Sequence, residues 1–400
     1  YGHILAGAIK DTICRHALFN GYNVERRAGW DTHGLPIEYE IEKILGIKNH
    51  QQILDYGIAN YNAECRKIVL RCADYWKTFM TRFGRWIDFD NDYKTMDFDF
   101  MQSVWSVFKD MWNKNLVYQG FKVMPYSTAC GTPLSNFEAN SNYKTVSEES
   151  IIVKFKAKGE DLYYLVWTTT PWTLPSNMLL CVNAEYDYSI YELNGEKYII
   201  CETLVKDVFG SGKNKKLPTD LKKINTFKGV ELKDKEYEPI FDFYGESNHK
   251  IVVDCYVKDS SGTGIVHIAP AFGEDDFRIC INNQIITSHG EGIRCPVDRN
   301  GCFTEPLTVE FLGHNVKDCD KEFIGILKSE NKLFKRLNIT HEYPFCWRSD
   351  TPLIYKATPS WFIEVTKIKD QMIKNCEKTN WIPDNVKSKR FNNWLKEARD

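Results

Sequence analysis

Residues 1–36 constrain the fold of this chain more than any other stretch. Apolar residues recur at helical spacing along residues 3–19 and predict an amphipathic helix: Ile4, Ala8, Ile9, Ile13, Ala17 and Leu18. Gly21 is expected to end this helix, and a short strand follows it. Asp31 then comes just past the carboxyl end of the strand, where open α/β sheets hold their ligands. The stretch therefore predicts an α/β sheet with a ligand near Asp31.

The start of the predicted helix favours a phosphate ligand. Gly2 lets a ligand approach the backbone closely, and His3 stands at a helix N-terminus, where free N–H groups attract anions. Each residue also has a plainer interpretation. His3 alone would be an exposed histidine at a helix start, and Asp31 alone would be a turn residue after a strand.

Two short motifs in this stretch resemble the class I aminoacyl-tRNA synthetases. Tyr1-Gly2-His3 matches the last three positions of their His-x-Gly-His signature, and residues 29–36 read Gly-Trp-Asp-Thr-His-Gly-Leu-Pro. The octapeptide is similar to the isoleucyl branch, because the leucyl branch has Ala-Phe at residues 32–33 and the valyl branch replaces most of it. The resemblance implies that Gly2 and His3 contact ATP, bound with Mg²⁺. It also implies that Asp31 pairs with the α-ammonium group of L-isoleucine.

Composition limits the classes of protein that remain. With 43% hydrophobic residues, 400 residues can bury two or three cores. The net charge of -2 provides no basic field, so any contact with tRNA must rest on local patches. Thirteen cysteines without a Cys-x-x-Cys indicate a reducing compartment, and no apolar run is long enough for a membrane span. We therefore expect a cytoplasmic protein without a membrane partner.

Three further helices are predicted before residue 116, near residues 37–45, 60–83 and 98–114. Asp97 is the expected N-cap of the third helix. Its apolar residues are expected to face the core rather than to stack on bases: Met101, Val104, Trp105, Phe108 and Trp112.

From residue 116 the pattern changes to short strands separated by turns, with Asn194-Gly195 as a two-residue hairpin turn. Such strands predict a compact barrel or sandwich. Together with the resemblance, they imply an α/β fold in which a Rossmann-type catalytic half-domain is interrupted by a β-rich, barrel-like editing insertion. The expected boundaries are 1–120 for the first catalytic half, 121–144 for a ribbon connector, 145–340 for the editing insertion, 341–358 for the ribbon return and 359–400 for the return to the catalytic domain.

The two ribbon segments contain knuckles at residues 127–133 and 343–352. In bacterial-type isoleucyl enzymes, the corresponding places resemble Cys-x-x-Cys pairs that hold one structural zinc. Here Ser127 and Ser349 occupy one position of each pair, so only Cys130 and Cys346 remain, with His341 as a remote spare ligand. Two thiols are too few for a tetrahedral site. We expect no structural zinc and a resemblance to the eukaryotic cytosolic branch, but we expect the knuckles to lie together.

Two motifs inside the insertion carry candidate chemistry. Residues 167–177 place a run of hydroxyls at a strand end, and residues 262–277 give a strand, a turn and an acidic helix start. Taken singly, the threonines reflect β-propensity, and the acidic residues complement a helix N-terminus. Together the motifs resemble the editing domain shared by the isoleucyl, valyl and leucyl synthetases.

The editing resemblance implies a role for each polar residue of these motifs. Asp276 would hold the α-ammonium of a misattached amino acid. The hydroxyls of Thr168, Thr169, Thr170 and Thr173 would surround the ester, Asn177 would support them, His267 would narrow the pocket, and Trp172 would belong to it. Valine and isoleucine differ by one methylene, roughly 1–3 kcal/mol in an apolar pocket, a limit for which this family is itself the standard example. A second, hydrolytic pocket supplies the missing accuracy without a protein nucleophile.

The implied activity is ATP-dependent charging of tRNA(Ile) with isoleucine, plus hydrolysis of Val-tRNA(Ile). The family's second signature, Lys-Met-Ser-Lys-Ser, is absent, so we expect a fragment. A valyl or leucyl enzyme, or a tRNA-binding module without turnover, remains an alternative, and other synthetases in a larger complex are open partners. A binding module would use a lysine-rich stretch that otherwise forms a solvated face: Lys213, Lys215, Lys216, Lys222, Lys223, Lys228, Lys233 and Lys235.

Overall fold

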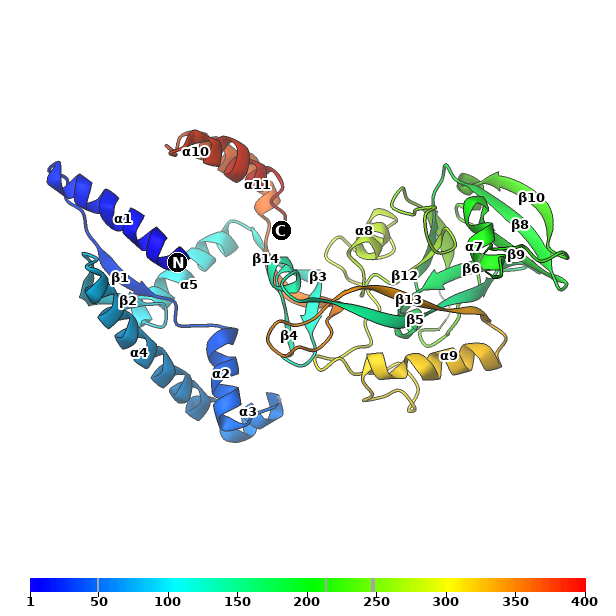
Figure 1. The fold of residues 1–400 in the computed structure, drawn as a ribbon, viewed down its shortest axis with the longest axis horizontal. Helices are drawn as coiled ribbons and strands as arrows, with labels where there is room; N and C mark the ends of the chain where they lie inside the picture. The colour runs from blue at the N-terminus through cyan, green and yellow to red at the C-terminus, as the bar shows by residue number, and fades with distance from the viewer. Residues whose placement is uncertain (49, 213, 246–248) are drawn as a thin grey trace. The chain divides into compact units, whose positions relative to one another are not determined.

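The computed structural model describes residues 1–48, 50–212, 214–245 and 249–400. Its fold is mixed α/β and divides into two compact units (Figure 1). Unit 1 comprises Tyr1–Tyr118 and Ile363–Asp400, and unit 2 comprises Gln119–Phe362. Across the described ranges, every helix is too short or too polar to cross a membrane.

Unit 1 is mainly helical around one small parallel strand pair. Its elements in chain order are α1 (Gly2–Phe19), β1 (Arg27–Trp30), α2 (Leu35–Leu45), α3 (His50–Tyr56), α4 (Ile58–Phe83), β2 (Asp88–Lys94), α5 (Phe98–Asn113), η5 (Val365–Lys367), α10 (Lys369–Glu377), η6 (Val386–Phe391) and α11 (Asn392–Lys396). β1 and β2 pair in parallel, with Trp30 opposite Lys94. The helices predicted near residues 3–19, 37–45, 60–83 and 98–114 are confirmed.

Glycine sets two of the helix ends in unit 1. Gly46 ends α2 at φ 71°, and Gly84 ends α4 at φ 77°. Both lie in the left-handed region that side chains with a Cβ rarely adopt. Asp97 is the N-cap residue of α5, but its carboxylate accepts the N–H of Lys94 at 2.7 Å rather than a helix N–H.

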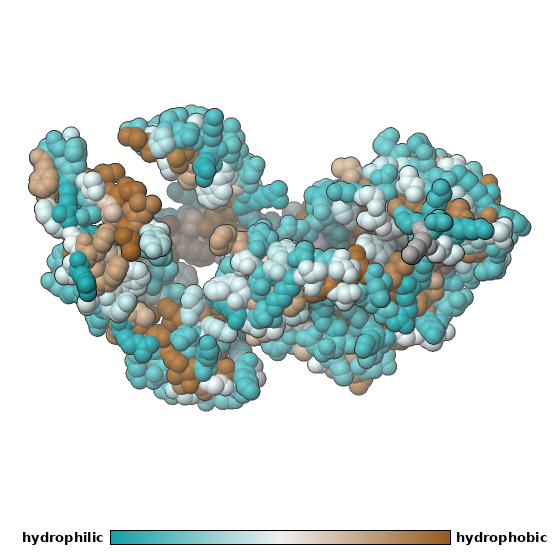
Figure 2. All heavy atoms as spheres, viewed as in Figure 1, coloured by the Kyte–Doolittle hydropathy of each residue, from teal (hydrophilic) through white to brown (hydrophobic). Residues whose placement is uncertain are grey.

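The predicted burial of the α5 aromatic face is wrong for the described residues. Trp105 is 68% exposed, Val104 is 53% exposed, and α5 has no buried residue. Among its described residues, unit 1 has only a two-stranded sheet, so its long amphipathic helices have little surface against which to pack. Apolar side chains, in brown, therefore lie at the surface of this unit (Figure 2).

Unit 2 contains two sheets. The larger follows the order β10-β8-β9-β6-β12-β7-β11, with β5 pairing both β6 and β13, and the smaller follows β14-β3-β4. The strands are β3 (Val117–Ser127), β4 (Thr132–Pro133), β5 (Tyr143–Lys156), β6 (Tyr163–Thr168), β7 (Leu179–Val182), β8 (Asp187–Leu193), β9 (Glu196–Cys201), β10 (Lys222–Lys228), β11 (Lys250–Val253), β12 (Ile265–Ile268), β13 (Leu333–Pro344) and β14 (Ile354–Ile363). The β-rich character expected after residue 116 is confirmed.

Short helices connect these strands. They are α6 (Asn136–Ala139), η1 (Pro171–Ser176), η2 (Glu202–Leu204), α7 (Val205–Phe209), η3 (Gly229–Leu232), α8 (Glu274–Asn282), η4 (Val316–Cys319) and α9 (Asp320–Ser329). The predicted hairpin is confirmed: β8 and β9 pair antiparallel around Asn194 at φ 52° and Gly195 at φ 82°. Positive φ at both turn residues gives a twist that matches the strands.

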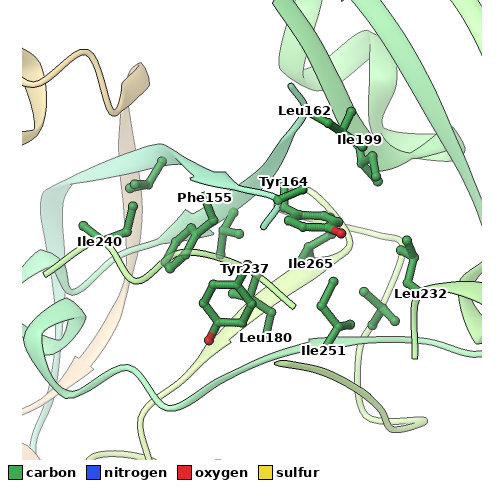
Figure 3. Close-up of a cluster of buried hydrophobic side chains, with 14 of the residues drawn as sticks. Phe155, Leu162, Tyr164, Leu180, Ile199, Leu232, Tyr237, Ile240, Ile251 and Ile265 are labelled. Atoms are coloured by element: carbon green, nitrogen blue, oxygen red, sulfur yellow. The ribbon is translucent and has the colours of Figure 1, made fainter. Parts of the chain in front are cut away.

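The main core of unit 2 lies between β5, β6, β7, β11 and β12. Phe155, Tyr164, Leu180, Tyr237 and Ile265 are each at most 2% exposed. Figure 3 shows these five side chains, with Phe155 beside Tyr237. This core fixes β6 and β12, which pair in parallel at Trp167 and Val266. Their carboxyl ends therefore lie together at one edge of the sheet, where both predicted editing motifs leave it.

Candidate active site

Unit 2 contains a cavity of about 410 Å³ where β6 and β12 end. Six of the predicted editing residues line it, from two segments about 90 positions apart in the chain: Thr168, Thr169, Thr170, Thr173, His267 and Asp276. The threonines come from the end of β6, from η1 and from the two-residue link between them, whereas His267 comes from β12 and Asp276 from the first turn of α8. The structure therefore brings the two motifs together around one cavity.

The residues of the threonine run hydrogen-bond to one another, so their four hydroxyls differ in how much hydrogen-bonding capacity remains for a ligand. The backbone N–H of Thr170 donates to Oγ1 of Thr168 at 3.1 Å, and the Thr173 hydroxyl donates to the carbonyl of Thr170 at 2.8 Å. Thr169 lines the cavity, and its hydroxyl has no partner in the described part of the chain. Thr169 therefore presents the hydroxyl with the most unused hydrogen-bonding capacity, whereas Thr173 is already engaged.

His267 is a buried, neutral imidazole whose two nitrogens are both used. Nε2 lies 2.9 Å from Oγ1 of Thr173, and Nδ1 lies 3.0 Å from Nδ2 of Asn177. Burial lowers the pKa of His267 from 6.5 to about 4. Because an amide nitrogen can only donate, Nδ1 must accept and Nε2 must carry the proton. His267 consequently has no free lone pair to act as a base in the cavity.

Asp276 is a carboxylate without a cation. It is the third residue of α8 and accepts the N–H of Ala269 at 2.8 Å through Oδ2. Burial raises the pKa of Asp276 from 3.8 to about 7. A Cβ on Gly273 would lie 2.9 Å from Cγ of Asp276, so glycine makes room for this carboxyl group. A carboxylate without a charge partner is costly to bury, so Asp276 is suited to bind a positive group.

Asp275, the preceding residue of α8, differs from Asp276 because it has a cationic partner. Arg278 forms ion pairs with Asp275 at 3.0 Å and with Asp254 at 2.8 Å. Both carboxylates are therefore neutralised within the protein. Among the described residues, Asp276 has no ion-pair partner. Of residues 274–276, Asp276 is the one that lines this cavity.

Two predicted residues of the site lie outside the cavity lining. Trp172 is 3% exposed, packs its ring on Phe272 with centroids 4.7 Å apart, and donates its backbone N–H to Asp320 at 2.9 Å. Trp172 is therefore not among the residues that line this cavity, because the helical turn of η1 directs its side chain into the core. Asn177 is also 3% exposed, and its side-chain amide contacts the His267 ring from the side away from the cavity.

Several lining residues were missed from the sequence. Trp167, Tyr256, Lys258, Gly262 and Gly264 all border the cavity. The Gly-Thr-Gly spacing at residues 262–264 was an available signal, because both glycines have positive φ, 77° and 74°. A Cβ on Gly264 would lie 2.2 Å from Cβ of Cys201. Tyr256 and Lys258 carried no such signal, since their positions depend on the loop between β11 and β12.

The residues predicted for ATP and isoleucine all lie in unit 1. Gly2, His3 and Asp31 are exposed. The His3 ring meets the edge of Trp76 at 6.3 Å between centroids, and a Cβ on Gly2 would have no atom within 4 Å. Asp31 follows β1 as predicted, and its Oδ1 lies 3.5 Å from the N–H of His33. Both Gly2 and Asp31 therefore have open space for a ligand.

The two knuckles lie together, as predicted. Sγ of Cys130 lies 3.9 Å from Sγ of Cys346, and the hydroxyls of Ser127 and Ser349 adjoin both thiols. The described residues contain no cluster of three or more histidine, cysteine, aspartate or glutamate side chains arranged to hold a metal ion. Serine oxygens take the places that two further thiolates would need for zinc.

Part of the lysine-rich stretch is paired with acids of the same unit. Lys215 binds Asp207, and Lys223 lies 2.8 Å from Glu202. Lys228 also forms an ion pair, at 2.9 Å with Asp187. Lys213 falls outside the described residues. Exposed ion pairs of this kind fit a solvated face, and they reduce the net positive charge available to a nucleic acid.

Comparison with known proteins places the sequence in one family. All of residues 1–400 match the family "tRNA synthetases class I (I, L, M and V)". Cytoplasmic isoleucine–tRNA ligase of Mus musculus is 52% identical over 407 residues, and isoleucine–tRNA ligase of Chlamydia abortus is 47% identical over 406 residues. Both alignments cover 100% of this chain, but only 32% and 38% of the relatives. The chain thus spans about a third of the length of the curated relatives it matches.

A likeness was also found among solved structures. The P. knowlesi cytosolic leucyl-tRNA synthetase editing domain has 14% sequence identity to this chain and a TM-score of 0.35. The likeness covers 47% of this chain and 95% of that domain.

Proposed function

The chain belongs to the class I tRNA synthetases of the isoleucine, leucine, methionine and valine group, and on that premise we propose that unit 2 hydrolyses wrongly charged Val-tRNA(Ile). The observation that carries this proposal is the unpaired carboxylate of Asp276, facing a cavity lined by threonine hydroxyls. An aminoacyl ester has a free α-ammonium group beside a polar ester. Asp276 is suited to the ammonium, and the hydroxyls are suited to the ester oxygens.

In the proposed reaction, water attacks the ester carbonyl, the bond to the ribose oxygen breaks, and the ribose oxygen takes a proton. Valine and tRNA are the products. Thr169, with its unengaged hydroxyl, is the residue best suited to orient the ester or the water. His267 does not act as the base, because Nδ1 accepts from Asn177 and Nε2 donates to Thr173. Catalysis would therefore rest on positioning of water and substrate, without a protein nucleophile.

The same arrangement suits a preference for the smaller amino acid. The His267 ring is buried and held at both nitrogens, so it forms a fixed wall of the cavity. A rigid wall excludes one extra methylene more effectively than a mobile side chain does. We therefore assign His267 to size exclusion and Asp276 to recognition of the ammonium group.

For the protein that contains this chain, we propose ATP-dependent charging of tRNA(Ile) with isoleucine in the cytoplasm. The names of the mouse and Chlamydia relatives support the substrate, and the mouse name supports the location. Gly2 and His3 would contact ATP, which supplies the activating phosphate chemistry with Mg²⁺. Asp31 would hold the ammonium group of isoleucine. The exposed position of all three residues leaves room for these ligands.

The editing proposal is tested by deacylation of Val-tRNA(Ile) by the 400-residue chain, with Ile-tRNA(Ile) in parallel. Asp276→Ala should slow the hydrolysis of Val-tRNA(Ile) by about 10- to 100-fold, the effect of losing a hydrogen bond to a charged group. Asp275→Ala is the matched control, since Asp275 already pairs with Arg278. Equal rates for the parent and for Asp276→Ala would refute the assignment.

A further inference from the structure

Tyr237 is a buried tyrosine that reaches toward the candidate site without lining it. It is 2% exposed, and its ring meets Phe155 edge to face at 5.6 Å in the core (Figure 3). Its hydroxyl donates to Oδ1 of Asn177 at 2.7 Å. Burial raises the pKa of Tyr237 well above its usual value, so the hydroxyl keeps its proton. The proposed hydrolysis does not yet account for this hydroxyl.

The amide of Asn177 has only one satisfactory orientation in this environment. Nδ2 lies 2.9 Å from the carbonyl oxygen of Leu179, which can only accept. A flipped amide would place two acceptor oxygens against each other and would leave both unpaired. The nitrogen must therefore face Leu179 and His267, and the oxygen must face Tyr237.

This orientation fixes the direction of every following hydrogen bond. Nδ2 of Asn177 donates to Nδ1 of His267, so the His267 proton resides on Nε2. Nε2 donates to Thr173, and the Thr173 hydroxyl donates to the carbonyl of Thr170 in the cavity wall. A one-way series of donors thus runs from the core to the cavity. Networks of this kind hold side chains more rigidly than isolated bonds do.

We infer that Tyr237 is a positioning residue for the candidate site, acting through Asn177 on the proton and the orientation of His267. The inference rests on the proposed function, since it assigns His267 the role of a fixed wall. Tyr237 itself touches no substrate. Arg294 holds the backbone carbonyl of Asn177 at 3.2 Å, so Asn177 stays in place when only the Tyr237 hydroxyl is removed. The hydroxyl therefore acts on the side-chain amide, which it orients together with the carbonyl of Leu179.

The test compares Tyr237→Phe with the parent chain by nitrogen NMR of ¹⁵N-labelled histidine, the His267 signal being assigned by its loss in His267→Gln. The parent should show a neutral ring protonated on Nε2 from pH 6 to 8. Tyr237→Phe should show an added fraction of the Nδ1-protonated tautomer, because the Asn177 amide then keeps its contact with the Leu179 carbonyl but loses the hydroxyl that holds its oxygen. Asn177→Asp supplies the reference for a ring protonated on Nδ1, since a carboxylate can only accept there.

Activity provides the second measurement. Tyr237→Phe should hydrolyse Val-tRNA(Ile) about 3- to 10-fold more slowly, the effect of one neutral hydrogen bond. Tyr164→Phe is the matched control, because Tyr164 is also 2% exposed in this core and its hydroxyl lies outside the relay. Tyr164→Phe should change neither the tautomer nor the rate. Thermal unfolding of both variants checks that the core remains packed.

The outcomes separate the relay from the proposed function. An unchanged His267 signal in Tyr237→Phe would overturn the inference, even if the rate fell. An altered tautomer with an unchanged rate would overturn the positioning role. If the parent chain hydrolysed no Val-tRNA(Ile), the proposed function would fail, and a tautomer shift in Tyr237→Phe would still support control of His267 by Tyr237.

Discussion

His267 and Thr173 are joined by a 2.9 Å hydrogen bond between Nε2 and Oγ1, although 94 positions separate them in the sequence. The bond consumes the only N–H of a neutral imidazole. It also occupies a hydroxyl that would otherwise face the cavity. This one contact fixes the His267 ring in the cavity wall and commits the Thr173 hydroxyl to holding it there. Thr169 remains the threonine with an unengaged hydroxyl.

Replacement of His267 by alanine should widen the specificity of the site. Removing the imidazole enlarges the cavity at its fixed wall, so the isoleucyl group should enter. Hydrolysis of Ile-tRNA(Ile) is expected to rise by about tenfold or more, the range for one methylene in an apolar pocket. Deacylation of both tRNAs measures the change, and the double variant with Asp276→Ala should lose the gain. An unchanged Ile-tRNA(Ile) lifetime would contradict the size-exclusion role.

Thr169 and Thr173 should respond differently to the same substitution. Thr173→Val leaves the buried Nε2–H of His267 unpaired, so we expect a stability loss of about 1–3 kcal/mol. Thr169→Val removes a hydroxyl without a protein partner, so Tm should stay within about 1 °C while hydrolysis slows. Calorimetry and deacylation on both variants provide the comparison. Equal Tm values for the two variants would argue against the hydrogen-bond assignment.

Replacement of Asp276 by asparagine should stabilise the chain at high pH. Burial raises the pKa of Asp276 from 3.8 to about 7, so between these values the folded state binds more protons than the unfolded state. Stability then falls as pH rises from about 4 to 7. Asp276→Asn lacks this dependence, so its Tm should match that of the parent near pH 4. At pH 8 its Tm should be higher by a few degrees, which corresponds to about 1–3 kcal/mol in the free energy of unfolding. A difference that stayed constant with pH would exclude this cause.

Gly264 should be the least replaceable glycine of the cavity rim. Alanine there would have φ near 74° and a Cβ 2.2 Å from Cβ of Cys201. We expect the free energy of unfolding to fall by about 3 kcal/mol or more, from backbone strain and overpacking together. Gly313 is the control, because its φ is 78° but its Cβ would meet no atom within 4 Å. Gly313→Ala should therefore cost only about 1–2 kcal/mol, read from thermal unfolding.

The knuckle pair offers a test by gain of function. Cys130 and Cys346 lie 3.9 Å apart beside Ser127 and Ser349. The double variant Ser127→Cys/Ser349→Cys would place four thiols at one point, and it should bind one zinc ion per chain. Metal analysis after dialysis measures the ratio. The parent chain and each single variant are the controls, and stoichiometric zinc in the parent would contradict our expectation for this site.

The fold was predictable wherever short-range geometry decides it. Apolar spacing located the helices of unit 1, Gly46 ended α2, and Asn194-Gly195 formed the hairpin between β8 and β9. Burial was less predictable. The α5 face has the spacing of a core helix, yet Trp105 is 68% exposed, because spacing specifies a face and not what covers it.

For the candidate site, the sequence by itself determined which residue types were available: the threonine run, His267 and the acidic start of α8. Tertiary structure decided what each of them does. Trp172 turned into the core, Arg278 neutralised Asp275 but not Asp276, and Tyr237 came to hold Asn177 from 60 positions away. The physical reason is that backbone conformation follows from neighbours in the chain. Charge state, hydrogen-bond direction and exposure follow from neighbours in space.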